Sequence, residues 1–271
     1  MQTVYFVNAF TTDRPFSGNP AAVCILEQWL PEATLQAVAA QHNLAETAYV
    51  VRTGPGQYTI RWFTPSVEID LCGHATLAAA HILFEHYGEQ HQTLAFESAS
   101  GTLKVSCGVQ LTLDFPVRKL TQSDAVQAYQ AAFSAPNAPV LYNECAALIE
   151  CESEQAVRNY TPDFGQLAAL PTQIQYLTAA GKHCDFVCRV FAPKLGIPED
   201  PVTGSAYTSL APYWAHKLNK TVLQAQQLSA RGGAVSLALP EPADTGARVL
   251  IGGQVQTVIV GEWVIEVSHG H

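Results

Sequence analysis

Short segments of alternating apolar and polar residues recur along the whole chain, and few long helical patterns separate them. In the first 118 residues, alternation and β-branched runs predict strands at 3–9, 22–26, 47–52, 58–63, 93–97, 103–106 and 111–115. Helical periodicity predicts one helix from Pro31 to Gln41 and a second, apolar on all sides, from Gly73 to Tyr87. Because a helix without a polar face must be buried, we expect the sheet to wrap around the second helix.

The second half of the chain shows the same order of patterns. Strands are predicted at 174–178, 185–191, 234–239, 248–251, 255–260 and 263–267, with a helix at 204–217. The additional stretch 125–164 is expected to hold one or two surface helices. Residues 116–119 form the most plausible junction, which divides the chain into an N-terminal half, 1–118, and a C-terminal half, 119–271. The two halves are free to exchange terminal strands.

Three short blocks occur twice in the same order. Residues 71–76 (LCGHAT) correspond to 202–207 (VTGSAY), and 98–101 (SASG) to 229–232 (SARG), both at an offset of 131. Residues 61–65 (RWFTP) correspond to 189–193 (RVFAP) at an offset of 128, so three residues are inserted before the second copy. A repeat of this length indicates duplication of a domain-sized fold.

Each copy places glycine and a small polar or titratable residue where an apolar helix begins. The unpaired amides and the dipole of a helix start can hold a carboxylate, so we expect Gly73 and His74 in one half, and Gly204 and Ser205 in the other, to bind one. The alternative is that Thr203 and Ser205 only cap the helix and that the glycines only form tight turns.

Three titratable side chains lie close to these helix starts in the sequence. Glu46 follows a predicted helix and begins an apolar strand, and burial of its carboxyl group would make it an effective proton shuttle. Asp200 precedes Pro201, which favours an extended backbone directed at the helix start. His74 lies in the first turn, where its ring can reach a ligand, although a histidine on an apolar helix is often only a core residue.

Composition narrows the classes of function. The net charge is −9 with only 14 Lys and Arg, which argues against a nucleic-acid or membrane surface. The first residues do not resemble a signal peptide, and seven cysteines without Cys-x-x-Cys pairs fit reduced thiols, so a cytoplasmic location is expected. Cys184 and Cys188 could bind zinc from one helix face, but alternation along a strand is the favoured interpretation. No metal site is therefore predicted.

Four blocks taken in order resemble the PhzF-like family, which is related to the phenazine-biosynthesis isomerase and, more distantly, to diaminopimelate epimerase and proline racemase. They are 8–10 (NAF) with 16–23 (FSGNPAAV), 43–47 (NLAET), 71–76 (LCGHAT) and 200–206 (DPVTGSA). The resemblance implies an α+β, diaminopimelate epimerase-like fold of two pseudo-symmetric halves, each a curled, mainly antiparallel sheet around a central helix. It also implies a cofactor-free active site between the halves and usually a homodimer.

The resemblance further implies roles for individual residues. Glu46 would be the general acid/base, while His74, Asp200 and Ser205 would hold the substrate and help to move or stabilise the proton. The amides around Gly73 and Gly204 would bind the substrate carboxylate. Two positions depart from the family pattern: Ala45 stands where many members have serine, and Tyr207 stands where many have histidine.

These residues favour isomerisation over two-base racemisation. The distant racemases use one cysteine at each helix start; Cys72 occupies the first place, but the offset of 131 leads to Thr203, whose hydroxyl is too weak an acid. The leading hypothesis is a cofactor-independent biosynthetic isomerase that moves a proton within a small carboxylate substrate through Glu46. The alternatives are an amino-acid epimerase or racemase that uses Glu46 with another group, and a small-molecule-binding protein without catalysis. No nicotinamide, phosphate-loop or metalloprotease motif occurs.

Overall fold

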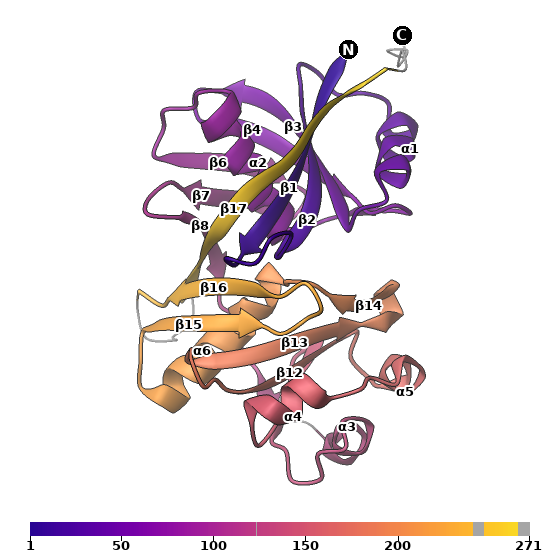
Figure 1. The fold of residues 1–271 in the computed structure, drawn as a ribbon, viewed down its shortest axis with the longest axis vertical. Coiled ribbons are helices and arrows are strands. Elements are labelled where there is room, and N and C mark those ends of the chain that lie inside the picture. The colour runs from indigo at the N-terminus through magenta and orange to yellow at the C-terminus, as the bar shows by residue number, and fades with distance from the viewer. Residues whose placement is uncertain (123, 241–246, 265–271) are drawn as a thin grey trace. The chain divides into compact units, whose positions relative to one another are not determined.

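The computed structural model describes residues 1–122, 124–240 and 247–264, and the chain forms two compact units (Figure 1). The first unit contains residues 1–114 and the chain from residue 252 onward, and the second contains residues 115–251. These units differ from the predicted halves, 1–118 and 119–271, mainly in the chain from residue 252 onward, which belongs to the first unit. The reason is β17 (Arg248–Trp263), which begins in the second unit and pairs antiparallel with β1 of the first.

The first unit is a curled, mainly antiparallel sheet with two helices. Its two parallel pairs, β2 with β3 and β4 with β6, each enclose a helix in the connection, as parallel pairing requires. These helices are α1 (Glu32–His42) and α2 (Gly73–His86). The strands are β1 (Gln2–Thr11), β2 (Asn19–Leu26), β3 (Glu46–Gly54), β4 (Gln57–Phe63), β5 (Glu68–Ile69), β6 (Thr93–Ser98), β7 (Gly101–Ser106), β8 (Leu111–Pro116) and the larger part of β17.

Helix α2 forms the centre of the first unit. Ten of its 14 residues are buried, which confirms the prediction of an apolar helix covered on nearly all sides. It packs against β1, β2 and β3. Its alanine-rich sequence allows this, because small side chains let a helix approach strands closely without leaving unfilled space.

The second unit repeats this plan. The sequence of pairings β2–β3–β4–β5, then β4–β6–β7, recurs as β11–β12–β13–β14, then β13–β15–β16, with parallel and antiparallel pairs at the same steps. Its elements are β9 (Thr121–Gln122), α3 (Val126–Ala132), β10 (Val140–Tyr142), β11 (Ala146–Glu150), α4 (Glu154–Asn159), α5 (Phe164–Ala169), β12 (Ile174–Ala180), β13 (Phe186–Ala192), η1 (Pro193–Leu195), β14 (Ile197–Asp200), η2 (Gly204–Ala206), α6 (Tyr207–Leu218), β15 (Val222–Gln227) and β16 (Gly233–Ala238).

A duplicated ion pair accompanies the duplicated strands. The guanidinium of Arg61 binds both carboxylate oxygens of Glu68 at 2.6 and 2.5 Å, and that of Arg189 binds both oxygens of Glu199 at 2.8 and 2.9 Å. Each guanidinium also lies 5.1 Å from a phenylalanine ring two residues further along its strand. The arginines are 128 residues apart and the glutamates 131, so the three inserted residues lie at η1 and the following turn.

Two predictions from the sequence were incomplete. The stretch 125–164 was expected to hold one or two surface helices, and it also contains the buried strand β11 and its neighbour β10, which were not predicted. Strand β15 was missed because three glutamines weaken its apolar pattern. In the structure, Gln224 and Gln226 are exposed while Leu223 and Ala225 are buried, so the alternation is present.

The final strand corrects a further prediction. Segments 248–251 and 255–260 were predicted as separate strands because Gly252 and Gly253 interrupt the apolar pattern, but β17 is continuous through both glycines. A Cβ atom at Gly253 would lie 2.4 Å from the Phe10 ring, so glycine is required there by close packing rather than by a turn. Of the strand predicted at 263–267, Trp263 ends β17, and residues 265–267 lie outside the described part of the chain.

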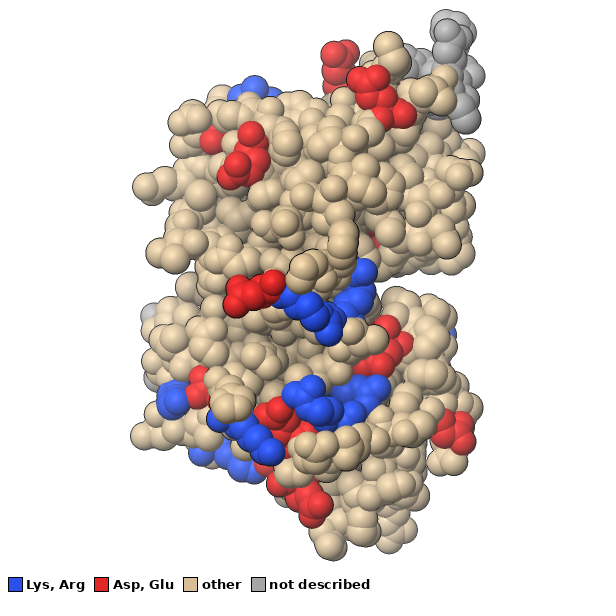
Figure 2. All heavy atoms as spheres, in the orientation of Figure 1, with Lys and Arg blue, Asp and Glu red and all other residues tan. Residues whose placement is uncertain are grey.

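Charged side chains on the surface of the second unit lie largely beside partners of opposite sign. Figure 2 shows its Lys and Arg side chains next to Asp and Glu, whereas uncharged side chains cover most of the visible face of the first unit. Three such pairs are Arg158 with Glu154, Lys217 with Glu150, and Lys220 with Asp185. Among the described helices, none has the length and hydropathy needed to cross a membrane.

Candidate active site

Glu46 lies at a boundary that the local sequence creates. Helix α1 ends at His42, and Asn43 follows in the left-handed conformation at φ 50°, which turns the chain toward β3. Glu46 is the first residue of β3 and is only 6% exposed. One of its oxygens, Oε2, lies 3.0 Å from Nε2 of His74, which is 5% exposed. The structure therefore brings together two side chains that are 28 positions apart in the sequence.

The other nitrogen of the His74 ring faces two further polar groups. Nδ1 lies 3.2 Å from the side-chain amide nitrogen of Asn19 and 3.5 Å from Sγ of Cys72. A neutral ring can accept a hydrogen bond from the amide of Asn19, and a protonated ring can donate one to the same amide when its oxygen faces the ring. Asn19 therefore suits both charge states of the imidazole.

Electrostatics favour the protonated ring. Burial alone would lower the pKa of His74, but the neighbouring Cys72 and Glu46 outweigh burial and hold this pKa well above its usual 6.5. Burial, followed by the nearby Glu46, raises the pKa of the Cys72 thiol. The raised pKa of His74 favours a protonated ring beside Glu46.

Glu46, Cys72 and His74 also form a cluster of potential metal ligands, with donor atoms within 4.8 Å of one another. Their arrangement does not suit a single ion, because Glu46 contacts Nε2 of the ring while Cys72 contacts Nδ1. One ion can bind only one of the two nitrogens. The cluster is instead suited to hydrogen bonding and proton transfer.

The start of α2 provides unpaired backbone N–H groups, which can bind an anion. Its N-cap residue, Cys72, makes no side-chain hydrogen bond to the first turn, and no acidic residue lies in that turn. Gly73 and His74, predicted to bind a carboxylate, are both buried in the first turn next to Glu46. The positive end of a 14-residue helix therefore coincides with the acid/base pair.

The start of η2 and α6 in the second unit is built differently. Asp200 ends β14, and its Oδ2 accepts a 2.6 Å hydrogen bond from the hydroxyl of Thr203. Gly204 is buried and Ser205 is partly exposed in the first turn of η2. The side chain of Thr203 does not cap η2, because its hydroxyl donates to Asp200 instead. The structure thus groups Asp200, Gly204 and Ser205 within one unit, and Glu46, Gly73 and His74 within the other.

Tyr207, which departs from the family pattern, lies fully buried at the beginning of α6. Its hydroxyl is 3.6 Å from Sγ of Cys188. Burial, followed by Cys188 and other neighbours that include Asp200, raises the pKa of Tyr207 well above its usual value, so the phenol stays neutral. Cys188 belongs to the core of β13, whereas Cys184 precedes that strand and is only partly buried.

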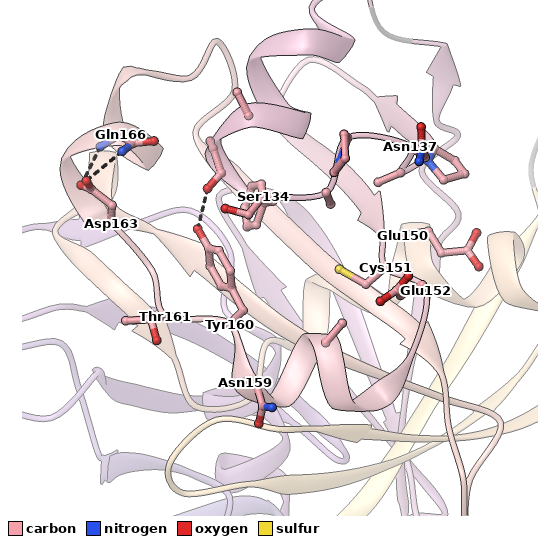
Figure 3. Close-up of a pocket in the computed structure, with 18 of the residues that line it drawn as sticks. Ser134, Asn137, Glu150, Cys151, Glu152, Asn159, Tyr160, Thr161, Asp163 and Gln166 are labelled. Carbon is pink, nitrogen blue, oxygen red and sulfur yellow. Dashed lines mark hydrogen bonds between the residues drawn. The ribbon is translucent and has the colours of Figure 1, made fainter.

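A hollow of about 1010 Å³ in the second unit contains none of these residues. It lies among α3, the following loop, α4 and the segment leading to α5 (Figure 3). The polar side chains in view bond mostly to their own surroundings: Tyr160 donates to the carbonyl of Ala132, and Asp163 accepts from Gln166. No histidine is among the described residues that line the hollow, so it holds no carboxylate–imidazole pair like that of Glu46 and His74.

The sequence did not identify every residue at these helix starts. Asn19 lies in a block that carries the family resemblance, but no role was assigned to it. Gln227, which contacts Thr203, was not considered because β15 itself was missed. No local pattern reveals such contacts, since the partners of Asn19 and Gln227 are 55 and 24 residues away.

Comparison with known proteins gives consistent results over nearly the full length. The family model of phenazine biosynthesis-like proteins matches residues 7–261. The chain is 50% identical over 256 residues to an uncharacterized isomerase of Pseudomonas aeruginosa, covering 94% of this chain and 95% of the relative. A crystal structure from the phenazine biosynthesis PhzF family of Enterococcus faecalis matches with a TM-score of 0.91 and 42% identity, covering 97% of this chain and 99% of the other.

More distant structures share only the fold. A probable proline racemase from Agrobacterium radiobacter has a TM-score of 0.63 at 12% identity, covering 98% of this chain and 94% of the other. Together with the PhzF family structure, this likeness confirms the predicted α+β, diaminopimelate epimerase-like fold class. The low identity supports no statement about shared chemistry.

Proposed function

The chain belongs to the phenazine biosynthesis-like, or PhzF-like, family, and we propose that it is a cofactor-independent isomerase that moves a proton within a small carboxylate substrate. The observation that carries the proposal is the buried contact of 3.0 Å between Glu46 and His74 at the start of α2. Relatives from two bacteria that cover more than nine-tenths of the chain are themselves named isomerases, which supports the reaction class.

Glu46 is the proposed general acid/base. A carboxylate beside an imidazolium is in the charge state that accepts a proton from carbon, and the ring can then stabilise the negative charge that remains on the substrate. Glu46 takes a proton from one carbon and delivers a proton to another carbon of the same molecule, and exchange of the carboxyl proton with solvent between the two steps labels the product in D₂O. The start of α2, with Gly73 and His74, is the proposed site for the substrate carboxylate.

For the second unit we propose substrate-binding roles for Asp200, Gly204 and Ser205. Three features support them: the helix start formed by η2 and α6, the partly exposed hydroxyl of Ser205, and the oriented carboxylate of Asp200. A double-mutant cycle of Glu46→Gln with Asp200→Asn tests whether both carboxylates serve one turnover. Groups that act together give losses that do not add, whereas independent groups give additive losses.

The test of the proposed function is proton exchange in D₂O. The protein is incubated with small amino acids, hydroxy acids and cyclohexadiene carboxylates, and deuterium uptake is followed by NMR. We expect one class of carboxylate to gain deuterium, and Glu46→Gln to lower the rate by at least about 100-fold while the fold is retained. The matched control is Glu27→Gln, because Glu27 is exposed. A fully active Glu46→Gln protein would rule the proposal out.

A second candidate is an amino-acid epimerase. It is favoured by the position of Cys72, whose Sγ is a second titratable group 3.5 Å from His74. Chiral chromatography of the reaction products separates the candidates, because an epimerase inverts a stereocentre and an isomerase produces a new constitutional isomer. Ligand binding without deuterium uptake or product formation would instead support a binding protein without catalysis.

A further inference from the structure

Thr203 occupies the position that Cys72 holds in the first unit, and its hydroxyl has a specific partner. By the offset of 131, residue 72 corresponds to 203. The Thr203 side chain does not cap the helix that it precedes. Instead, Oγ1 donates to Oδ2 of Asp200 at 2.6 Å, within the usual range for a hydroxyl bonded to a carboxylate. One side of the Asp200 carboxylate is therefore held in a defined direction.

Gln227 in turn holds both residues. It ends β15, is 1% exposed, and its amide oxygen accepts the backbone N–H of Thr203 at 3.0 Å. Its amide nitrogen donates to the backbone carbonyl of Asp200 at 2.7 Å and lies 3.4 Å from Oγ1 of Thr203. A single buried side chain thus fixes the backbone on both sides of the turn that carries Asp200 to the helix start.

The first unit shows that the fold does not need this arrangement. By the pairing of the equivalent strands, Ile69 corresponds to Asp200 and Ser98, the last residue of β6, corresponds to Gln227, the last residue of β15. The first unit therefore builds equivalent strands and an equivalent helix start with isoleucine, cysteine and serine in place of Asp200, Thr203 and Gln227. A buried glutamine carries a desolvation cost that an apolar residue does not. The three polar side chains occur together in one unit only, which argues that they serve the carboxylate and not the fold.

We infer that Thr203 and Gln227 are positioning residues for Asp200: Gln227 fixes the turn, and the hydroxyl of Thr203 fixes the direction of the carboxylate. This inference rests on the role proposed above for Asp200 in substrate binding. It also explains why threonine replaces the cysteine of a two-base racemase at this position. A hydroxyl is a stronger donor to a carboxylate than a thiol is.

The first experiment compares Thr203→Val with Thr203→Ser in the D₂O exchange assay. Valine keeps the shape and removes the hydroxyl, whereas serine keeps the hydroxyl. We expect Thr203→Val to lower kcat/KM about 10-fold, the usual scale for one hydrogen bond to a charged group, and Thr203→Ser to stay within about twofold of wild type. The matched control is Thr161→Val, since Thr161 is exposed in the same unit. Unchanged exchange in Thr203→Val, or an equal loss in Thr203→Ser, overturns the inference.

A second measurement does not depend on turnover. In protein labelled with ¹³C at aspartate carboxyls, we expect the titration midpoint of Asp200 to rise in Thr203→Val and to stay unchanged in Thr203→Ser, because the hydroxyl bonds the ionised form. The neighbouring Glu199, which is paired with Arg189, and the buried Tyr207 are the same in every variant. If no substrate exchanges at all, the proposed function fails and this titration still decides the inference. Equal midpoints in all three proteins contradict it.

Gln227→Met tests the turn, with Gln226→Met as its matched control on the exposed face of the same strand. We expect Gln227→Met to speed deuterium exchange of the Thr203 amide at least about 10-fold, because that amide loses the side-chain oxygen that accepts its hydrogen bond, and to lower kcat/KM. Gln226→Met should change neither quantity. Full protection of the Thr203 amide in Gln227→Met would overturn the role of Gln227.

Discussion

The two units share a chain path and differ where chemistry is proposed. In both units an Arg–Glu pair joins two neighbouring antiparallel strands, and an apolar helix follows. Both units also make the same succession of parallel and antiparallel pairings. At the start of α2, the first unit has Glu46, Cys72 and His74 in contact. By the offsets of 128 and 131, the second unit has Ile174, Thr203 and Ser205 at these positions.

Each unit also supplies its carboxylate from a different element. Glu46 comes from the first residue of β3, and Asp200 comes from the last residue of β14. Glu46 contacts a titratable ring, whereas Asp200 contacts hydroxyl and amide groups that do not titrate in the physiological range. The comparison teaches that duplication preserved the backbone and the helix starts, while the polar contacts diverged: they support the proposed proton transfer in one unit and the proposed substrate binding in the other.

The largest effect that we expect from this difference between the units is on the rate of proton exchange. We expect Glu46→Gln to lower proton exchange about 1,000-fold and Asp200→Asn only about 100-fold, because the first removes the group that carries the proton and the second weakens substrate positioning. Single-turnover exchange rates at saturating substrate measure both. If Asp200→Asn proved the more damaging change, the assignment of proton transfer to the first unit would be wrong.

The duplicated Arg–Glu pairs provide a comparison of stability. The side chain of Arg189 is 11% exposed and also donates to the carbonyl of Tyr160 at 2.6 Å, whereas that of Arg61 is 27% exposed. We expect Arg189→Met to reduce the free energy of unfolding by about 3 kcal/mol and Arg61→Met by about 1 kcal/mol. Chemical denaturation of both variants measures this difference. Equal losses would mean that burial does not distinguish the two pairs.

The pH dependence of stability sharpens the description of the first helix start. Because the pKa of His74 is raised in the folded protein, protonation of the ring stabilises the fold fully below the unfolded pKa of about 6.5. That contribution is lost as pH rises through the higher folded pKa. The difference in unfolding free energy between wild type and His74→Asn should therefore shrink as pH increases above about 6.5. A difference that grows with pH would show that the ring is neutral in the folded state.

The smallest expected effect concerns Cys72. Burial keeps this thiol protonated, so an isomerase that uses Glu46 alone should tolerate Cys72→Ala with a change in exchange rate of no more than about threefold. Loss of activity in Cys72→Ala, together with inversion at a stereocentre, would favour the epimerase candidate.

Most of the fold followed from local patterns. The apolar sequence from Gly73 onward predicted the central helix of the first unit, because a helix without a polar face has to be buried. The repeated blocks predicted the second copy. Strand β15 and the strands within 125–164 escaped because glutamines and short lengths weaken alternation, and these strands are identified only by the neighbours with which they pair.

The sequence by itself determined the duplication, the two helix starts and the identity of the titratable residues beside them, because backbone propensity and helix capping depend on residues close in the chain. Only the tertiary structure decided which side chains touch: Glu46 with His74, His74 with Asn19, and Gln227 with Thr203. These contacts join residues separated by 24 to 55 positions. Their geometry depends on strand register and on the burial of β2, β3 and β15, quantities that no local pattern encodes.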